Sequence, residues 1–89
     1  MRAIVTVVGR DRVGIIAGIS ALLAERGVNV LDVSQTILEQ YFTMIMLVDA
    51  KECRLPFSEL ADELERGGEG LGVSVRIQRE DIFEAMHKI

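Results

Sequence analysis

The residues best suited to chemistry lie in one short segment, Gly9 to Gly14, that runs directly into a predicted helix. Unpaired backbone N–H groups and the positive end of the helix dipole make the start of a helix attractive to a carboxylate or a phosphate. Gly14 has no Cβ to keep a ligand from the backbone, although glycine in a helix costs about 1 kcal/mol relative to alanine. The segment therefore predicts an anion site. A purely structural interpretation stays open, in which Asp11 caps the helix and Gly14 lets it pack closely on a sheet.

The common phosphate and metal motifs do not fit this segment. Gly9 and Gly14 have the spacing of the two P-loop glycines, but Ile15 and Ile16 stand where Lys-Ser/Thr would bind phosphate and magnesium. A dinucleotide fingerprint needs a third glycine in the turn, and a copper site would need a pair of cysteines there. We therefore exclude a nucleoside triphosphatase, a dinucleotide-binding protein and a copper carrier.

A catalytic interpretation of the same segment is weak. An acylphosphatase uses an arginine near the first helix and an asparagine from a strand, and Arg10, Arg12 and Asn29 offer those residue types. No arginine follows within residues 15–23, where that family carries its phosphate-binding side chain. We predict that the protein is not an enzyme, and we keep acylphosphatase-like hydrolysis as a minor alternative.

Composition narrows the setting of the protein. Ten Lys and Arg against fourteen Asp and Glu give a net charge of −4, and the basic residues are scattered, so we expect no nucleic-acid binding. With one cysteine, Cys53, and one histidine, His87, a single chain forms neither an internal disulfide nor a Cys/His zinc cluster. The uncharged run at residues 13–24 is shorter than the roughly 20 residues of a membrane span. These features predict a cytoplasmic protein without a metal, a cofactor or a membrane partner.

The hydrophobic pattern predicts the elements that position the segment. Strands are predicted at residues 3–8, 28–37, 41–48 and 71–79, the second and third forming a hairpin. Helices are predicted at residues 13–26, from Pro56 to Arg66, and at residues 80–88. Gly27 is expected to end the first helix, and the glycine-rich residues 67–70 are expected to form a flexible turn. In the second strand, Val28, Val30, Asp32, Ser34 and Thr36 are expected to share one face.

This order, β-α-β-β-α-β with a terminal helix, predicts an α+β ferredoxin-like sandwich in one domain, residues 1–89. Both long helices would cover one face of a four-stranded antiparallel sheet. The strands carry apolar side chains on both faces, so the other face should also be covered, by a dimer or by the terminal helix. The opposed sets are Val5 and Val7 against Ile4 and Val8, and Ile45 and Leu47 against Phe42, Met44, Met46 and Val48. Because 49% of the residues are hydrophobic and the mean hydropathy is +0.30, we expect a homodimer to cover surface that one small domain cannot hide.

The runs Val7–Ile16, Ala24–Val30 and Met46–Asp49 together resemble an ACT domain. With the segments around Ser34 and Tyr41, the likeness extends to the small stand-alone ACT proteins that are similar to regulators of the glycine cleavage system. The resemblance implies a regulatory module that binds an amino acid or a similar small effector between two subunits of a side-by-side dimer.

Carried over position by position, the resemblance nominates the effector-binding residues. They are Asp11, Arg12, Val13 and Gly14 in the turn, and Asn29 at the start of the second strand. Asn29 also suits this role by its chemistry, because an amide offers both a donor and an acceptor to a zwitterion. No output domain is recognised in these residues, so the signal is expected to pass to a partner protein. The main alternative is a ligand-free adapter whose dimer surface and terminal helix bind another protein.

Overall fold

The computed structural model describes residues 1–86 and has the predicted order of elements. The strands are β1 (Arg2–Arg10), β2 (Asn29–Leu38), β3 (Tyr41–Asp49) and β4 (Val73–Arg79). The helices are α1 (Ile15–Glu25), α2 (Phe57–Leu71) and α3 (Glu80–Met86). All neighbouring strands pair antiparallel, in the order β2-β3-β1-β4. The predicted ferredoxin-like α+β fold is therefore confirmed.

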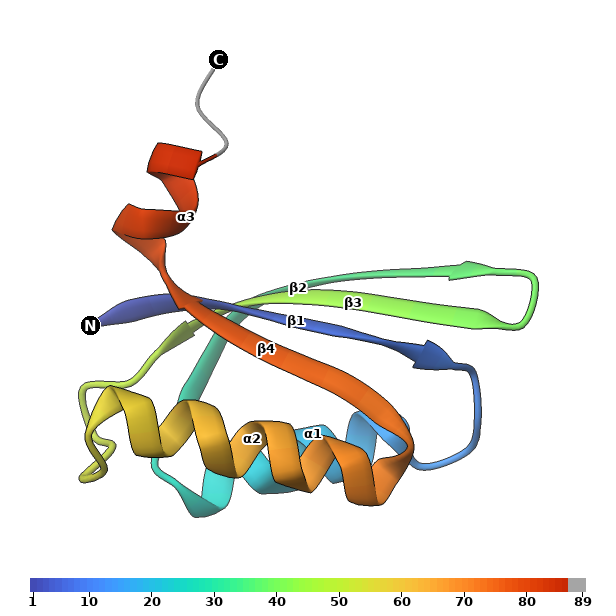
Figure 1. Cartoon of the computed structure of the whole chain (residues 1–89), viewed down its shortest axis with the longest axis horizontal. Helices are drawn as coiled ribbons and strands as arrows, with labels where there is room; N and C mark the ends of the chain where they lie inside the picture. Colours follow the sequence, from blue (N-terminus) through green and yellow to red (C-terminus); the bar gives the residue numbers. More distant parts are fainter. Residues whose placement is uncertain (87–89) are drawn as a thin grey trace.

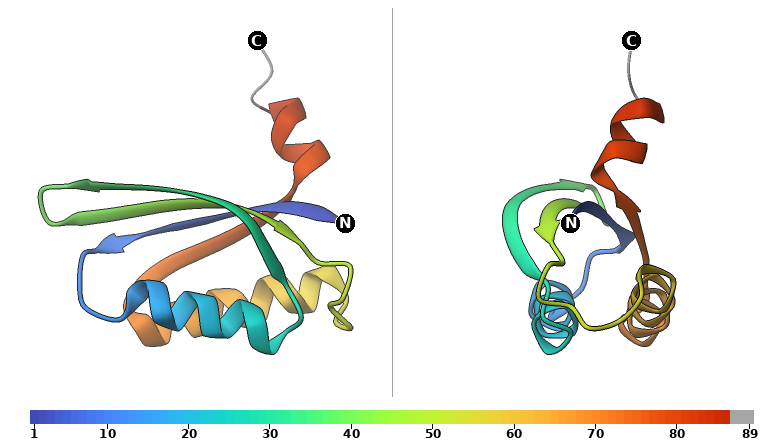
Figure 2. Two further views of the ribbon diagram at one scale, coloured as in Figure 1. Left: turned by 180° about the vertical axis from the view of Figure 1, so that it is seen from behind. Right: turned by 90° about the vertical axis from the view of Figure 1, so that its left-hand side faces the viewer.

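The two long helices lie side by side on one face of the sheet, and α3 stands on the other side (Figures 1 and 2). The core lies between the sheet and α1 and α2. Alternate residues of the strands enter this core, as the period-2 pattern predicts. They are Ala3, Val5 and Val7 of β1, Phe42, Met44, Met46 and Val48 of β3, and Val73, Val75 and Ile77 of β4.

Close contact between α1 and α2 depends on glycine. A Cβ added at Gly18 of α1 would lie 2.7 Å from the side chain of Leu71, and one added at Gly67 of α2 would lie 2.6 Å from Leu22. A Cβ at Gly68 would lie 2.4 Å from a methyl group of Val75 on the sheet. The predicted flexible turn at residues 67–70 is therefore wrong: α2 continues through it, because close packing there outweighs the low helix propensity of glycine.

A β-bulge changes the faces of β2. Val30 pairs with Val48 and Asp32 pairs with Leu47, which leaves Leu31 as an extra residue in β2. Val30 therefore packs against the core, whereas Asp32 and Ser34 lie on the opposite face. The prediction that Val30 shares a face with these residues is wrong, because one inserted residue reverses the side-chain alternation.

Some strands and helices begin or end at residues other than those predicted. β1 continues past Val8 through Gly9 to Arg10, because Gly9 pairs with Phe42 on one side and Val73 on the other. α1 begins at Ile15 rather than at residue 13. Gly27 follows α1 with a φ of 72°, the left-handed conformation expected of a glycine after a helix. The end of the predicted terminal helix, with His87 and Lys88, lies outside the described residues.

Candidate functional site

The predicted effector turn, Asp11 to Gly14, connects the end of β1 to the start of α1 (Figure 1). The backbone N–H of Asp11 donates a hydrogen bond of 2.7 Å to the carbonyl oxygen of Gln40. Gln40 lies in the short connection between β2 and β3. The turn is therefore held against the end of the β2–β3 hairpin.

The start of α1 is open and has no side-chain cap. Gly14 is the N-cap residue, with φ 94° and ψ −3°, and no side chain bonds to the first turn. A Cβ added to Gly14 would have no neighbour within 4 Å, and no acidic residue lies in the first turn. Both structural interpretations are therefore wrong: Asp11 is not the cap, and Gly14 does not permit close packing. The positive φ at position 14 explains why the residue there is glycine.

The other two residues of the turn point in different directions. Val13 is fully exposed to solvent. The guanidinium of Arg12 lies beside Gly72, because a Cβ added there would be 2.7 Å from its Nη1. Gly72 caps the C-terminus of α2, where the helix dipole favours a positive charge. The Arg12 side chain thus lies near the C-terminal end of α2, a position that the sequence did not indicate.

Asn29 lies at the opposite end of the sheet from the turn. It pairs with Asp49, which is also the partner of Arg2 at the beginning of β1, whereas the turn follows Arg10. At about 3.3 Å per residue, the length of β1 separates the two positions by about 26 Å. Figure 1 shows α1 running from the turn back to this far end. Within one chain, the structure brings Asp11 to Gly14 together but not Asn29.

Asp49 is the charged group nearest to Asn29 in the strand register. Its carboxylate accepts a hydrogen bond of 3.0 Å from the backbone N–H of Lys51. This bond is the main reason that the pKa of Asp49 lies below its ordinary value of 3.8. Asp49 is therefore ionised at neutral pH, and its Oδ1 also lies 3.4 Å from the amino group of Met1, which opposes its negative charge.

The side of the molecule formed by α1 and β2 is exposed and has little charge. β2 is an edge strand, and all its residues except Val30 are exposed. The outward residues of α1 are Ile16, Ala17, Ser20, Ala21, Ala24 and, at its last position, Glu25. Ile16, a large apolar side chain of α1, is 48% exposed. The uncharged run at residues 13–24 was the signal for this surface, because a water-facing helix normally carries charge.

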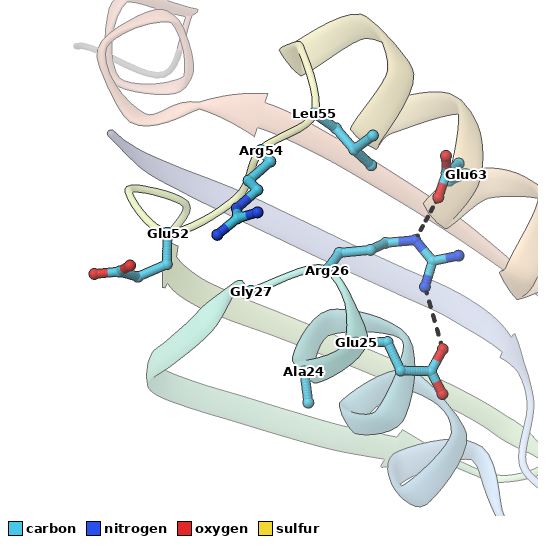
Figure 3. Close-up of a pocket in the computed structure, with 8 residues that line it drawn as sticks. All are labelled: Ala24, Glu25, Arg26, Gly27, Glu52, Arg54, Leu55 and Glu63. Carbon is cyan, nitrogen blue, oxygen red and sulfur yellow. Dashed lines mark hydrogen bonds and ion pairs between the residues drawn. The ribbon is translucent and has the colours of Figure 1, made fainter.

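A pocket of about 580 Å³ opens where α1 ends and the loop before α2 passes (Figure 3). Arg26 crosses it, with its Nε donating to Glu63 at 2.8 Å and its Nη1 to the carbonyl oxygen of Leu22 at 3.0 Å. Glu25 lies 3.6 Å from the same guanidinium. Arg26 is therefore committed to joining α1 to α2. Sequence reasoning did not find this pocket, since its lining comes from segments far apart in the chain.

The described residues contain neither a metal cluster nor a membrane helix. Among residues 1–86, no three His, Cys, Asp or Glu side chains gather closely enough to hold a metal ion. None of the helices in that part of the chain is long and apolar enough to cross a membrane.

The chain forms a small ferredoxin-like domain, in which α1 and α2 cover one face of an antiparallel β2-β3-β1-β4 sheet. The start of α1, after the first strand, is open. The family model described as an ACT domain matches residues 2–78. The chain therefore belongs to the ACT domain family, whose members are typically regulatory ligand-binding modules. The resemblance seen in the sequence is confirmed.

Known proteins are similar to this chain over most of its length. A UPF0237 protein of Methanocaldococcus jannaschii is 54% identical, covering 99% of this chain and 98% of that protein. The solved structure of an ACT domain protein from Streptococcus pneumoniae is 48% identical, covers 98% of both chains and superposes with a TM-score of 0.84. A candidate glycine cleavage system transcriptional repressor, 23% identical with a TM-score of 0.71, shares the fold over 86% of this chain and 44% of its own.

Proposed function

We propose that this chain is a non-enzymatic sensor that binds an amino acid or a similar small effector between two subunits and signals to a partner protein. One observation carries the proposal: the residues nominated for the effector lie at opposite ends of the sheet, separated by about 26 Å along β1. One amino acid cannot touch both positions in a single chain. A shared effector therefore requires two chains.

The exposed α1–β2 side supports a twofold dimer of the required geometry. An edge strand with free N–H and C=O groups is a template for pairing with another strand. If β2 pairs antiparallel with its symmetry mate, the two α1 helices also run antiparallel. The turn of one subunit then approaches Asn29 of the other, and twofold symmetry creates two equal sites.

The chemistry of the two halves suits a zwitterion. The uncapped N–H groups at the start of α1 favour a carboxylate, and the carboxylate of Asp11 favours an ammonium group. The Asn29 amide supplies a donor and an acceptor from the other subunit. Signalling would follow from mass action, because an effector transmits a signal only if it binds one dimer arrangement more tightly than another.

The first test is a thermal-unfolding screen against amino acids at millimolar concentration and fixed protein concentration. An effector present at a hundredfold its Kd adds about 2.7 kcal/mol of stability. Each kcal/mol shifts the midpoint of such a small domain by about 4 to 8 °C. We expect one compound to give a clear upward shift. A flat screen would instead favour the ligand-free adapter.

Complementation between subunits tests the composition of the site. Asp11→Ala and Asn29→Ala homodimers should each fail to bind the compound found in the screen. After unfolding and co-refolding of an equal mixture, mixed dimers carry one intact site, so binding should return at about a quarter of all sites. The matched control is each variant refolded alone. If both variants bind normally, or if mixing restores nothing, the site between subunits is wrong.

A ligand-free adapter remains the second candidate, because α3 presents exposed apolar side chains, including Ile82 and Met86. Acylphosphatase-like hydrolysis has less support. Arg12 lies beside Gly72, and Arg10 and Asn29 lie at opposite ends of the sheet in one chain. Turnover of an acyl phosphate that depends on Arg10 would revive that alternative.

A further inference from the structure

The strand β4 has a free outer edge. It is the last strand in the sheet order β2-β3-β1-β4 and pairs with β1 on its inner side. Within residues 1–86, residues 74–78 form no backbone hydrogen bond beyond this pairing. Alternate residues of a strand point their N–H and C=O groups to opposite edges, so a row of these groups faces outward from β4. Such an edge is a template for a further strand.

A groove of about 490 Å³, here called the β4-edge groove, lies along this edge. Four consecutive residues of β4, residues 75–78, line it, as expected where a groove follows the edge of a strand whose side chains alternate between two faces. Ala61 and Glu65 of α2 line the groove on one side of the strand, and Phe83 of α3 lines it on the other. Figure 2 shows β4 at one side of the sheet, between α2 and α3.

An extended peptide is the kind of ligand that matches this groove. A row of backbone N–H and C=O groups is satisfied by another extended backbone, as in peptides that add a strand to a sheet edge. On the α2 side of the groove, Val75, Ile77 and Ala61 favour apolar side chains. Glu65 lies on the same side and would repel an acidic side chain there. The α2 side therefore selects apolar residues of the peptide.

Arg76 determines the charge that fits the other side of the strand. Its side chain is on the face opposite Val75 and Ile77 and is exposed. It forms no ion pair within residues 1–86, whereas Arg79, at the end of the same strand, is paired with Asp81 at 3.1 Å. A carboxylate on the neighbouring position of an added strand would supply the missing partner, since opposite charges directly across two strands are stabilising.

The position of Arg76 also opposes pairing with a second copy of this chain. Arg76 is the central residue of β4, which runs from Val73 to Arg79. Full-length antiparallel pairing of two β4 strands about a twofold axis would therefore place the two Arg76 side chains directly opposite each other. Like charges in this arrangement are destabilising. We propose that the β4-edge groove binds an extended segment of a different protein, in which apolar side chains facing α2 alternate with acidic side chains facing Arg76.

This inference goes beyond the proposed function and does not depend on it. The α1–β2 dimer would use the other edge of the sheet, so both β4 edges remain free in it. Binding at β4 requires neither an effector nor this dimer, and Ser20→Glu should leave it unchanged. A flat effector screen with intact peptide binding would defeat the proposed function alone. An effector that binds to a chain with no peptide binding would defeat this inference alone.

The test uses a fluorescein-labelled, end-blocked peptide of seven residues, the length of β4, in which valine and glutamate alternate. Fluorescence anisotropy follows its titration with the full chain up to millimolar concentration, and we expect saturable binding. Two further peptides carry N-methyl groups on all valine amides or on all glutamate amides. The amides of only one set face β4, so one version should bind at least tenfold more weakly and the other like the parent peptide. No binding of the parent peptide, or parent-like binding of both versions, would overturn strand addition.

Charge reversal tests the role of Arg76. Arg76→Glu should weaken binding of the glutamate peptide at least tenfold and should bind a peptide of alternating valine and lysine more tightly than the unmodified chain does. Lys51→Glu makes the same charge change on an exposed residue outside the groove and is the matched control. Far-UV circular dichroism checks that each variant is folded. If Arg76→Glu does not fold, Arg76→Gln should still weaken binding at least threefold. Equal binding by the folded Arg76 variant and Lys51→Glu would overturn acidic recognition.

Hydrogen exchange and sedimentation identify the bound edge and its occupant. Alternate backbone amides within residues 74–78 should exchange at least tenfold more slowly when the glutamate peptide is bound, and those of β2 should not change. Protection of β2 alone would place the peptide on the other edge and overturn the assignment. If the peptide halves the mass of the chain and Ser20→Glu does not, a second copy occupies the β4 edge and the proposal of a different protein is wrong.

Discussion

The helices α1 and α2 cover the same sheet in the same way, yet their outer faces are opposite in character. Outward positions of α1 carry Ile16, Ala17, Ser20, Ala21 and Ala24, with one charged residue, Glu25, at the end of the helix. Outward positions of α2 carry Ser58, Glu59, Asp62, Glu65, Arg66 and Glu69. Arg66 and Asp62 of α2 form an ion pair across one turn, which raises the pKa of Arg66.

The facing sides of α1 and α2 are alike, because each helix needs a glycine at the contact with the other. Gly18 of α1 lies under Leu71 of α2, and Gly67 of α2 lies under Leu22 of α1, so each helix offers a glycine to a leucine of the other. Folding therefore makes similar demands on both helices. Before Glu25, the outer face of α1 is exposed and uncharged. Small side chains of this kind are what two closely packed helices require. The contrast points to association on the α1 side and to water on the α2 side.

The largest effect we expect comes from placing the same charge on each outer face. Ser20→Glu brings like charges together across the proposed α1–α1 contact, at a cost of about 3 kcal/mol, or about a hundredfold in Kd. The thermal midpoint of the unmodified chain should rise with protein concentration, because association stabilises the fold. Ser20→Glu should reduce this dependence, and Ser58→Glu should preserve it. Equal behaviour of the two variants would remove the distinction between the faces.

The next largest effect compares alanine substitutions at two glycines of α2, one packed against the sheet and one in open space. Gly68→Ala forces a Cβ toward Val75 and should destabilise the fold by about 1 to 3 kcal/mol. Gly70→Ala has open space around it and should stabilise the helix by about 0.5 to 1 kcal/mol. Urea unfolding at fixed protein concentration measures both. A neutral Gly68→Ala would show that α2 does not need its close approach to the sheet.

A smaller effect concerns how the two helices begin. α2 starts after Pro56 and has Glu59 in its first turn, whereas α1 starts at Gly14 with neither an acid nor a side-chain cap. Gly14→Ala should cost about 1 kcal/mol, because its φ of 94° disfavours a Cβ even where nothing clashes. Gly14→Asn should cost less, since asparagine tolerates the left-handed region. Equal unfolding midpoints in urea for the two variants would contradict this explanation.

The smallest effect on stability that we expect concerns Asp49. This carboxylate lies at the end of β3, outside both helices, and can be compared with the charged residues of α2. Its pKa is lowered in the folded state, so its stabilising contribution is complete above the ordinary value of 3.8 and is lost as the pH falls through the lowered pKa. Asp49→Asn should therefore lower stability slightly at neutral pH and flatten the acid limb of stability below pH 3.8, where the protonated Asp49 already resembles asparagine. An unchanged acid limb would show that the hydrogen bond from Lys51 does not stabilise the fold.

The fold was predictable from local patterns, whereas the site was predictable only in part. Alternation separated Val5 from Ile4 in β1 and Met44 from Ile45 in β3, and the structure places Val5 and Met44 in the core. The turn at Asp11 to Gly14 was found because its residues are contiguous. Its distance from Asn29 and the contact of Arg12 with Gly72 were not evident, because they depend on how distant segments meet.

The sequence by itself determined the order of strands and helices, the apolar material on both sheet faces and the uncharged character of residues 13–24. These follow from local backbone preference and from side-chain periodicity, which each segment carries on its own. Only the tertiary structure decided that α2 continues through Gly67 to Gly70, that Leu31 forms a bulge and that the nominated effector residues lie at opposite ends of the sheet. The physical reason is that close approach, strand register and distance are properties of pairs of segments, and no single segment encodes them.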